Sequence, residues 1–466
     1  MATSSRWGRA LLRAAVALPC FAALGAQAAD TAPAYQVITL AGIPIDFMFF
    51  ALVLLGVATL HRHTLQVALT GLVVVALYKL AFTGFKAGSL QLHFAHEWVT
   101  LANLLGLLLG FALLSKHFED SRLPLLLPKF LPDDWKGGFV LLVMIFVLSA
   151  FLDNIAAALI GGAVAHVVFR GKVHIGYLAA IVAASNGGGS GSVVGDTTTT
   201  MMWIAGVNPL EVLDAYTAAL PALLIFGVLA ARQQHAYNAI TKDAPAGLHV
   251  DWSRVGIVIF ILVVAVLANV IANLHFHSVL DRFPVIGAAV WVALLVSVPL
   301  RAPDWSILPG AFKGAVFLLS LVSIASMMPV EHLPLASWQA TLGLGFLSAV
   351  FDNIPLTALA LKQGGYDWGL LAYAVGFGGS MIWFGSSAGV GLANMYPEAK
   401  SVLAWVRAGW HVALAYVVGF FFALAVHSWQ PHPIRGAVPA APASAVPAAV
   451  APASAVPAAV APGAPA

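Results

Sequence analysis

The chain has 466 residues, of which 61% are hydrophobic and only 9% are charged. A soluble domain carries roughly 25% charged residues and a disordered chain is polar, so this composition excludes both classes. It predicts an all-α protein that crosses a lipid bilayer many times, and the net charge of +3 gives no support to a nucleic-acid partner.

Residues 1–28 have the pattern of a signal peptide. Three arginines precede an apolar run from Ala14 to Leu24, and Ala26-Gln27-Ala28 supplies the small residues that signal peptidase favours. We therefore predict a mature chain that begins outside the membrane with a periplasmic lead-in over residues 29–43; an uncleaved anchor is the alternative. The single cysteine, Cys20, lies in this segment, so the mature chain would have no thiol for a disulfide or a metal site.

Apolar stretches along the chain predict ten membrane spans, because a helix needs about 20 apolar residues to cross the hydrocarbon core. These spans run approximately over residues 44–60, 65–82, 99–115, 175–207, 213–231, 255–274, 284–300, 314–328, 369–395 and 402–426. Two further stretches, 138–169 and 339–362, are each interrupted by Asp-Asn. Each arm has about 12 to 15 residues and covers roughly 18 to 22 Å of the ~30 Å core, so we predict two re-entrant hairpins.

Basic residues support this arrangement, since short cytoplasmic loops collect Lys and Arg. Lys136 precedes the first hairpin, and Arg170 and Lys172 follow it. Both ends of the hairpin should therefore lie on the cytoplasmic side, as a re-entrant segment requires. Lys79, which lies near a span end, is expected to extend toward the membrane interface.

An internal repeat divides the chain into two halves. Leu-Ser-Ala-Phe-Leu-Asp-Asn-Ile at 148–155 recurs as Leu-Ser-Ala-Val-Phe-Asp-Asn-Ile at 347–354, and a Gly/Ser-rich break interrupts an apolar span after each copy. Five spans precede the second half, so it should be inverted relative to the first. Inverted repeats with interrupted segments indicate a secondary transporter with a site near the bilayer midplane.

The predicted domain boundaries follow from this repeat. They are a first half over 44–231 with hairpin 138–169 and broken helix 175–207, a cytoplasmic linker over 232–254, and a second half over 255–428 with hairpin 339–362 and broken helix 369–395. Residues 429–466 form an Ala/Pro/Val tail that contains an unchanged ten-residue repeat, and this composition predicts disorder.

Three carboxylates, Asp153, Asp196 and Asp352, lie at the interruptions, with no Lys or Arg in the same motifs. An acidic side chain at mid-bilayer costs about 2.5–3.5 kcal/mol on insertion scales, so each requires a proton or a cation. Hard cations such as Na⁺ favour oxygen ligands, and these three carboxylates are the predicted Na⁺ ligands. The amide and hydroxyl groups predicted to complete the ion site are Asn154, Asn186, Ser190, Thr197, Asn353, Ser380, Ser386 and Ser387.

The same motifs have simpler interpretations. One Asp-Asn pair alone is equally consistent with a helix cap, and the glycines with tight packing of membrane helices. The duplication of the pair in the same local context favours a site. Of the run of threonines after Asp196, only Thr197 is expected to take part in it.

The paired motifs resemble the citrate-transporter-like family of the ion transporter superfamily, and most closely its bacterial sodium/proton antiporters. The matching segments are Leu-Asp-Asn-Ile at 152–155, Phe-Asp-Asn-Ile-Pro at 351–355, Gly-Ser-Val-Val-Gly-Asp-Thr at 191–197 and Gly-Gly-Ser-Met-Ile-Trp-Phe-Gly-Ser-Ser at 378–387. The resemblance implies opposed hairpins, elevator-like movement, a homodimer and a bacterial inner-membrane location. It also implies an ion site that includes Asp153, Asn154, Asp196, Thr197, Asp352, Asn353, Ser386 and Ser387.

The sequence therefore predicts a secondary active transporter, specifically a sodium/proton antiporter, rather than an enzyme. Its expected partners are the lipid bilayer and small inorganic cations, with no cofactor besides the transported Na⁺ and H⁺. A cation-coupled carrier of citrate or another di- or tricarboxylate is the alternative, ranked second because the carboxylates at the breaks would repel an anionic substrate. A channel or a non-transporting scaffold would not need the repeated Asp.

Overall fold

The computed structural model describes residues 35–60, 63–123, 129, 131–241, 249–276, 279 and 282–433. The predicted signal peptide with Cys20, and the part of the predicted tail beyond residue 433, lie outside the described residues. Within the described part the chain is mostly helical, and two short strands, Thr39–Leu40 (β1) and Ile43–Pro44 (β2), form one antiparallel pair. The all-α class is confirmed for this part of the chain.

The first half contains α2 (Ile45–Thr59), α3 (Thr64–Tyr78), the π-helix η1 (Lys79–Thr83), α4 (Leu90–Asp120), α5 (Trp135–Ser149), α6 (Asn154–Val168), α7 (Ile175–Ser190), α8 (Thr197–Ile204), α9 (Pro209–Leu213) and α10 (Ala215–Tyr237). The second half contains α11 (Trp252–His275), α13 (Val285–Ser297), η3 (Trp305–Ile307), α14 (Leu308–Ser326), η4 (Val330–His332), α15 (Trp338–Ser348), α16 (Asn353–Gln363), α17 (Trp368–Gly378), α18 (Ser387–Met395), η5 (Pro397–Lys400), α19 (Val402–Ala408) and α20 (Trp410–His427).

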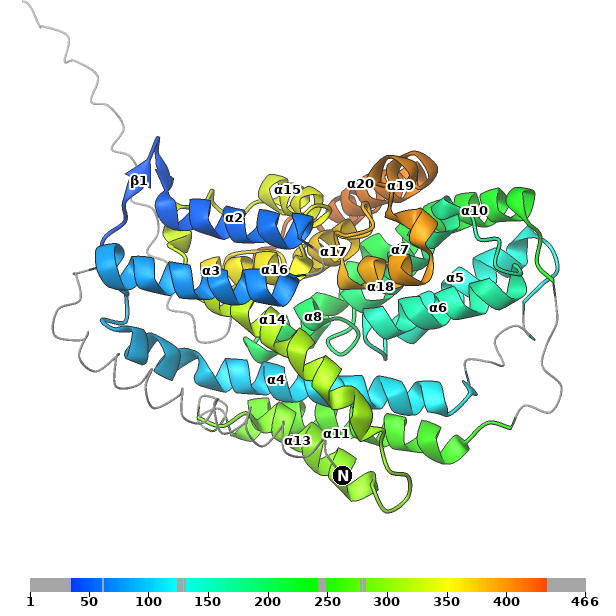
Figure 1. Ribbon diagram of the computed structural model, residues 1–466, viewed down its shortest axis with the longest axis horizontal. Coiled ribbons are helices and arrows are strands. Elements are labelled where there is room, and N and C mark those ends of the chain that lie inside the picture. The colour runs from blue at the N-terminus through cyan, green and yellow to red at the C-terminus, as the bar shows by residue number, and fades with distance from the viewer. Residues whose placement is uncertain are drawn as a thin grey trace, which may run out of the picture.

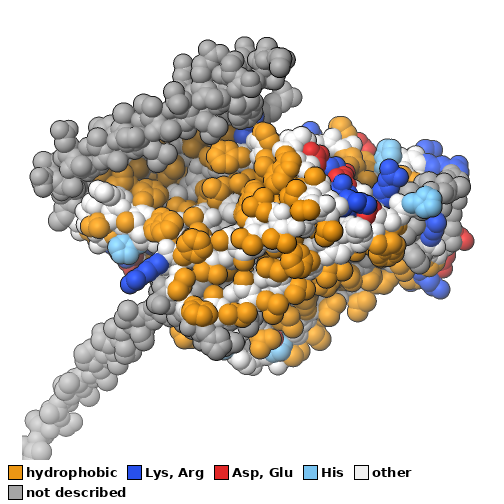
Figure 2. All heavy atoms as spheres, turned by 90° about the horizontal axis from the view of Figure 1, so that it is seen from below, with side chains coloured by type: hydrophobic (Ala, Val, Ile, Leu, Met, Phe, Trp, Pro, Cys, Tyr) orange, Lys and Arg blue, Asp and Glu red, His pale blue; other side chains and the backbone are white. Residues whose placement is uncertain are grey.

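Five helical segments among the described residues are long and apolar enough to cross a membrane, as expected of a membrane-embedded protein. They are Thr64–Thr83, Leu90–Asp120, Pro209–Tyr237, Trp305–Ser326 and Trp410–His427. Figure 2 shows hydrophobic side chains over most of the middle of one face, with the largest group of charged side chains toward one end. The count of ten spans and the inversion of the second half remain predictions.

The helices form two packing groups, and many of them run roughly parallel to the long axis of the molecule (Figure 1). In the first group α5, α7, α10, α17 and α20 pack on one another, and α15 packs on α17. In the second group α4 packs on α11, α13 and α14, while α3 packs on α2 and α14. Helix α14 also contacts α16, which packs on α15 and α17, so α14 joins the second group to the first.

Each predicted hairpin is a pair of helices with a break at its Asp-Asn. Helix α5 ends at Ser149 and α6 begins at Asn154, while α15 ends at Ser348 and α16 begins at Asn353. The last serine of each incoming arm donates a hydrogen bond to the neighbouring broken helix: Ser149 Oγ to the Ser185 carbonyl and Ser348 Oγ to the Val375 carbonyl, both at 2.6 Å. The two copies of the motif therefore hold their broken helices by the same contact.

One glycine in each half lets the hairpin approach its broken helix closely. A Cβ at Gly188 would overlap the carbonyl oxygen of Phe146, and a Cβ at Gly378 would overlap that of Gly345. Only hydrogen fits between the two backbones at these points. The glycine content of the breaks is thus explained by backbone-to-backbone contact as well as by the interruption of the helix.

The predicted span 402–426 is corrected by the structure, because it is two helices rather than one. Helix α19 ends at Ala408, and α20 begins after Gly409. A Cβ at Gly409 would lie 2.8 Å from the Cβ of Ala179 on α7, closer than real side chains approach. The break therefore lies where the chain passes directly over α7, a contact that apolar composition alone does not reveal.

Candidate functional site

The tips of both hairpins converge on one carboxylate, Asp196. Asn154 Nδ2 of the first tip lies 3.3 Å from Asp196 Oδ1, and Asn353 Nδ2 of the second tip lies 3.3 Å from Asp196 Oδ2. Helices α5 and α6 lie toward one end of the long axis and α15 and α16 toward the other (Figure 1). Asp196 is 3% exposed and caps the first turn of α8, beyond the break of the first broken helix.

Thr198 completes the set of donors to Asp196, and sequence reasoning missed it. Its hydroxyl lies 2.8 Å from Oδ2 and its amide 3.4 Å from Oδ1. A carboxylate has about four lone-pair sites, and four donors now occupy them. The missed signal was the position of Thr198 two residues after an N-cap Asp, where the backbone N–H points back at the cap.

Asn186 links the two broken helices. Its Nδ2 lies 3.0 Å from Ser380 Oγ and 3.1 Å from Ser386 Oγ, and its Oδ1 accepts from Asn154 Nδ2 at 3.1 Å. All four side chains are buried. This network brings the predicted Asn154, Asn186, Ser380 and Ser386 together, but it aims both serines at an amide rather than at a carboxylate.

The two hairpin carboxylates lie at the N-caps of the outgoing arms and are half-buried. Asp352 Oδ2 accepts from Ser387 Oγ at 3.1 Å, and its Oδ1 accepts from the Ile354 amide at 3.1 Å. Asp153 occupies the equivalent N-cap of α6. No ion pair joins these residues or Asp196 to a Lys or Arg among the described residues.

Two small cavities border these carboxylates, and α14 lines both. The first, of about 190 Å³, is bordered by Asp153, Asp196 and Thr197 together with α4 and α14. The second, of about 170 Å³, is bordered by Asp352 and Ser387 together with α2, α3 and α14. Each holds several waters or a partly hydrated ion, since one water occupies about 30 Å³ in the liquid.

Two predicted residues are placed differently from the rest. Ser190 Oγ donates to the Gly187 carbonyl at 2.8 Å, so this hydroxyl is engaged by its own helix. Thr197 lines the first cavity, but the hydroxyl that reaches Asp196 is that of Thr198. In the described ranges, no three His, Cys, Asp or Glu side chains gather closely enough to hold one metal, so the three carboxylates do not form a single cluster.

A buried ion pair lies outside this site and corrects the expectation for Lys79. Lys79 Nζ lies 2.9 Å from Asp46 Oδ1, and the two side chains are 2% and 1% exposed. Lys79 does not extend to the interface because Asp46, near the start of α2, provides a partner inside the fold. The spacing of 33 residues between them has no local pattern that sequence reasoning can detect.

Comparison of the chain with protein-family models and with curated proteins returned no match. The resemblance to citrate-transporter-like antiporters therefore stays a prediction that rests on the paired motifs.

Proposed function

We propose that the protein is a secondary active transporter that exchanges Na⁺ for H⁺ across the membrane. The observation that carries the proposal is the meeting of two interrupted hairpins on Asp196, with a small cavity beside each hairpin carboxylate. Non-helical backbone inside a membrane protein is tolerated where it lines a cavity, and such breaks are where secondary transporters bind ions.

The three carboxylates have different roles in this proposal. Asp196 is saturated by four donors, so it orients both tips rather than giving up its oxygens to a cation. Asp153 and Asp352 border the cavities and alternately carry a proton or Na⁺. The Ser387 hydroxyl and, in the other cavity, Thr197 add neutral oxygens of the kind that hard cations accept.

The size and charge of the cavities favour an ion over a carboxylate substrate. Sites for small organic molecules occupy about 300–1,000 Å³, whereas these cavities have about 190 and 170 Å³. An anionic substrate is normally bound by Arg or Lys, and in the described part of the chain no such residue lines either cavity. The cation-coupled carrier of citrate thus has less support than the exchanger.

Flux through proteoliposomes tests the proposal. An inward Na⁺ gradient is imposed and the internal pH is followed with a trapped dye. Exchange of entering Na⁺ for leaving H⁺ should raise the internal pH, and labelled citrate should not accumulate. An unchanged internal pH, or Na⁺-dependent accumulation of citrate, would reverse the assignment.

Substitution of the hairpin carboxylates locates the exchange. Asp153→Asn and Asp352→Asn should each reduce the flux by at least about tenfold, equivalent to ~1.4 kcal/mol. The matched control is Glu119→Gln, because Glu119 is a surface carboxylate that is 62% exposed and lines neither cavity. If both Asp variants exchange at the wild-type rate, the site lies elsewhere.

A further inference from the structure

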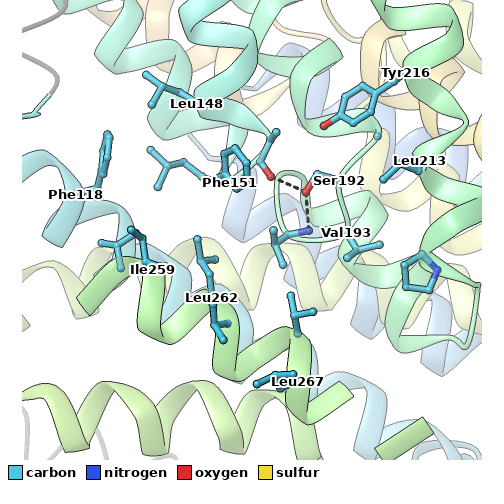
Figure 3. A pocket seen from close by; sticks show the side chains of 18 of the residues that line it. Phe118, Leu148, Phe151, Ser192, Val193, Leu213, Tyr216, Ile259, Leu262 and Leu267 are labelled. Atoms are coloured by element: carbon cyan, nitrogen blue, oxygen red, sulfur yellow. Dashed lines mark hydrogen bonds between the residues drawn. The ribbon is translucent and has the colours of Figure 1, made fainter. Parts of the chain in front are cut away.

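A large apolar groove lies beside the first hairpin tip, and Asp196 is not among its lining residues. Its volume is about 880 Å³, and its walls are the hairpin tip at 148–152, the break at 191–194, the start of α10 and the helix α11. Figure 3 shows Phe151, Val193 and Leu213 facing Ile259, Leu262 and Leu267 across this space. The groove thus separates the unit that contains the proposed ion site from a helix of the second packing group.

The side chains of Ser192 and Tyr216, which line the groove, are already hydrogen-bonded within the protein. Ser192 Oγ donates to the Ala150 carbonyl at 2.6 Å and accepts from the Val194 amide at 3.4 Å (Figure 3). Tyr216 hydroxyl donates to the Gly188 carbonyl at 2.8 Å. Among the described residues that line the groove there is no Asp, Glu, Lys, Arg or His. A polar ligand would therefore meet no charged side chain and no unpaired side-chain hydroxyl in this lining, whereas an apolar occupant needs neither.

The groove opens onto an exposed apolar surface. Its lining side chains Phe151, Ile259 and Leu267 are 57%, 56% and 51% exposed, and they are all large and hydrophobic. Other side chains of α11 that do not line the groove, including Phe260 and Ile271, are exposed as well. In a membrane-embedded protein such a surface is covered by acyl chains, so the groove is continuous with the hydrocarbon of the bilayer.

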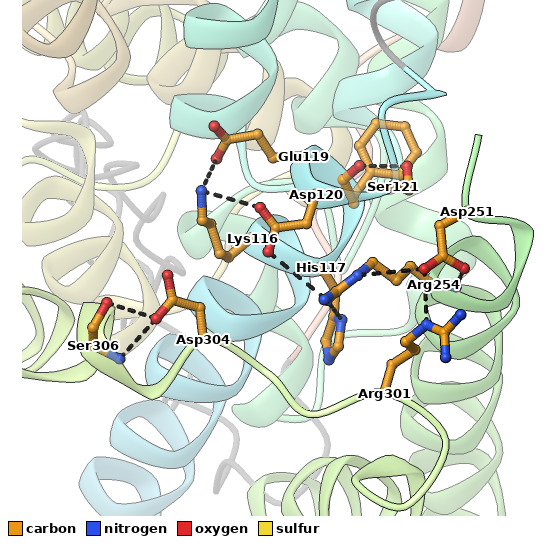
Figure 4. Close-up of polar contacts among 11 residues, drawn as sticks. Lys116, His117, Glu119, Asp120, Ser121, Asp251, Arg254, Arg301, Asp304 and Ser306 are labelled. Atoms are coloured by element: carbon orange, nitrogen blue, oxygen red, sulfur yellow. Dashed lines mark hydrogen bonds and ion pairs between the residues drawn. The ribbon is translucent and has the colours of Figure 1, made fainter. Parts of the chain in front are cut away.

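Ion-paired side chains lie at one end of the groove. Arg254, next to the lining residue Val255, lies 3.7 Å from both Asp120 and Asp251, and Arg301 Nε lies 2.8 Å from Asp251 Oδ2 (Figure 4). The hydrogen bond from Arg301 outweighs the effect of desolvation and lowers the pKa of Asp251. These charged groups place the polar interface of the membrane beside Val255 and Phe118, where the groove begins.

The length of the groove matches one leaflet. From Val255 to Leu267 a helix rises about 18 Å, and half of the hydrocarbon core is about 15 Å. An extended chain of methylenes that follows α11 over this length therefore reaches from the membrane interface to the middle of the bilayer.

We infer that this groove binds an acyl chain of a bilayer phospholipid, which enters from the charged end and runs along α11 to Leu267. The ion pairs at its mouth join equal numbers of basic and acidic side chains, Lys116, Arg254 and Arg301 with Glu119, Asp120 and Asp251. The chain rather than the head group is therefore recognised. The bound chain packs against residues 148–152, shortly before the Asn154 that donates to Asp196, and its binding does not depend on the proposed ion exchange.

Photolabelling tests this inference on the full-length protein in nanodiscs. The discs contain phosphatidylcholine with a diazirine on one acyl chain, and labelled peptides are mapped by mass spectrometry. We expect labels on the tip at 148–152 and on the break at 191–194. The break is the more selective position, because its residues are less exposed than Phe151 of the tip. Replacing part of the phosphatidylcholine with phosphatidylglycerol should leave the labelling unchanged.

Groove-filling variants provide the decisive comparison. Val263→Trp and Ile259→Trp should reduce labelling of the tip severalfold, whereas Ile271→Trp, on the same helix but outside the groove, should not. All three positions are exposed, so the larger ring is tolerated, and thermal melting checks the fold. Three results would overturn the inference. They are labelling of the wild-type tip no higher than background, labelling that the groove-filling variants leave unchanged, and cross-links between two copies at the groove.

Discussion

The two hairpins hold their broken helices by matched contacts, but the chemistry at the breaks differs. Ser149 and Ser348 make the same hydrogen bond, and Gly188 and Gly378 make the same close approach. The N-cap after the break, however, is Asp196 in the first half and Ser386 in the second. The repeated frame therefore supports a site in which only one half supplies the central carboxylate.

The residues that directly follow the two N-caps also differ between the halves. Thr197 follows Asp196 and borders the cavity of Asp153, while Ser387 follows Ser386 and donates to Asp352. A hydroxyl residue from the first turn after the break thus borders the cavity of each hairpin carboxylate. The central position differs between the halves, so the two cavities are not chemically equivalent.

Substitution of the two N-caps is the most severe test of this comparison. In Asp196→Asn, the new amide group faces at least one of the four donors that the carboxylate now accepts from. Each unsatisfied buried donor costs about 1–3 kcal/mol, so we expect loss of exchange and a lower melting temperature.

Ser386→Ala is the matched variant, because it removes one hydroxyl at the equivalent position. We expect it to cost about 1 kcal/mol, as for the loss of a helix cap, and to retain partial exchange. Both variants are measured by proteoliposome flux and thermal melting. Equal effects at the two positions would show that the central carboxylate has no special role.

The close glycine contacts are the next test, and here the two halves should behave alike. Gly188→Ala and Gly378→Ala each force a methyl group into a neighbouring backbone carbonyl, so overpacking should destabilise each variant by about 1–3 kcal/mol. Gly256→Ala in α11 is the control, since nothing lies within 4 Å of the added methyl group. Chemical denaturation in detergent measures all three variants, and a large effect in only one half would break the structural equivalence.

Removal of the neighbouring hydroxyls should have a smaller effect. Ser387→Ala loses a hydrogen bond to Asp352 worth about 0.5–1.5 kcal/mol, which raises the Na⁺ concentration for half-maximal flux by a few-fold. Thr197→Val keeps the shape and removes the hydroxyl that borders the other cavity. A similar shift in both variants indicates that both cavities bind Na⁺, and a shift in Ser387→Ala alone assigns binding to the second half.

The smallest expected effect is that of Glu331, which lies outside both hairpins. It serves as a reference for how the stability of the protein depends on pH. Burial raises the pKa of Glu331, but hydrogen bonds from Lys86 and Tyr35 outweigh it and lower the pKa from 4.5 to about 2. This stabilisation is therefore complete above pH 4.5 and is lost as the pH falls toward 2. The difference in melting temperature between wild type and Glu331→Gln should be small at pH 7 and should vanish at pH 2, and a difference that grows on acidification would contradict the assignment.

Much of the site was predictable because it is encoded in local and repeated patterns. An Asp-Asn pair within an apolar stretch predicts a break at that point, and its recurrence predicts a second one in the same context. The structure places both breaks there and brings Asn154 and Asn353 to Asp196. The partner of each hydroxyl was not predictable, since Thr198 rather than Thr197 reaches Asp196, and Ser190 donates to its own helix.

The sequence by itself determined the helical class, the membrane-compatible composition and the positions of the interruptions, because these depend on hydropathy and on which residues end a helix. Only the tertiary structure decided that Lys79 pairs with Asp46, that the last span breaks at Gly409, and that Asp196 is the point where both tips meet. Each of these depends on contacts between residues that are distant along the chain. Such contacts arise when whole helices pack, and no local pattern specifies them.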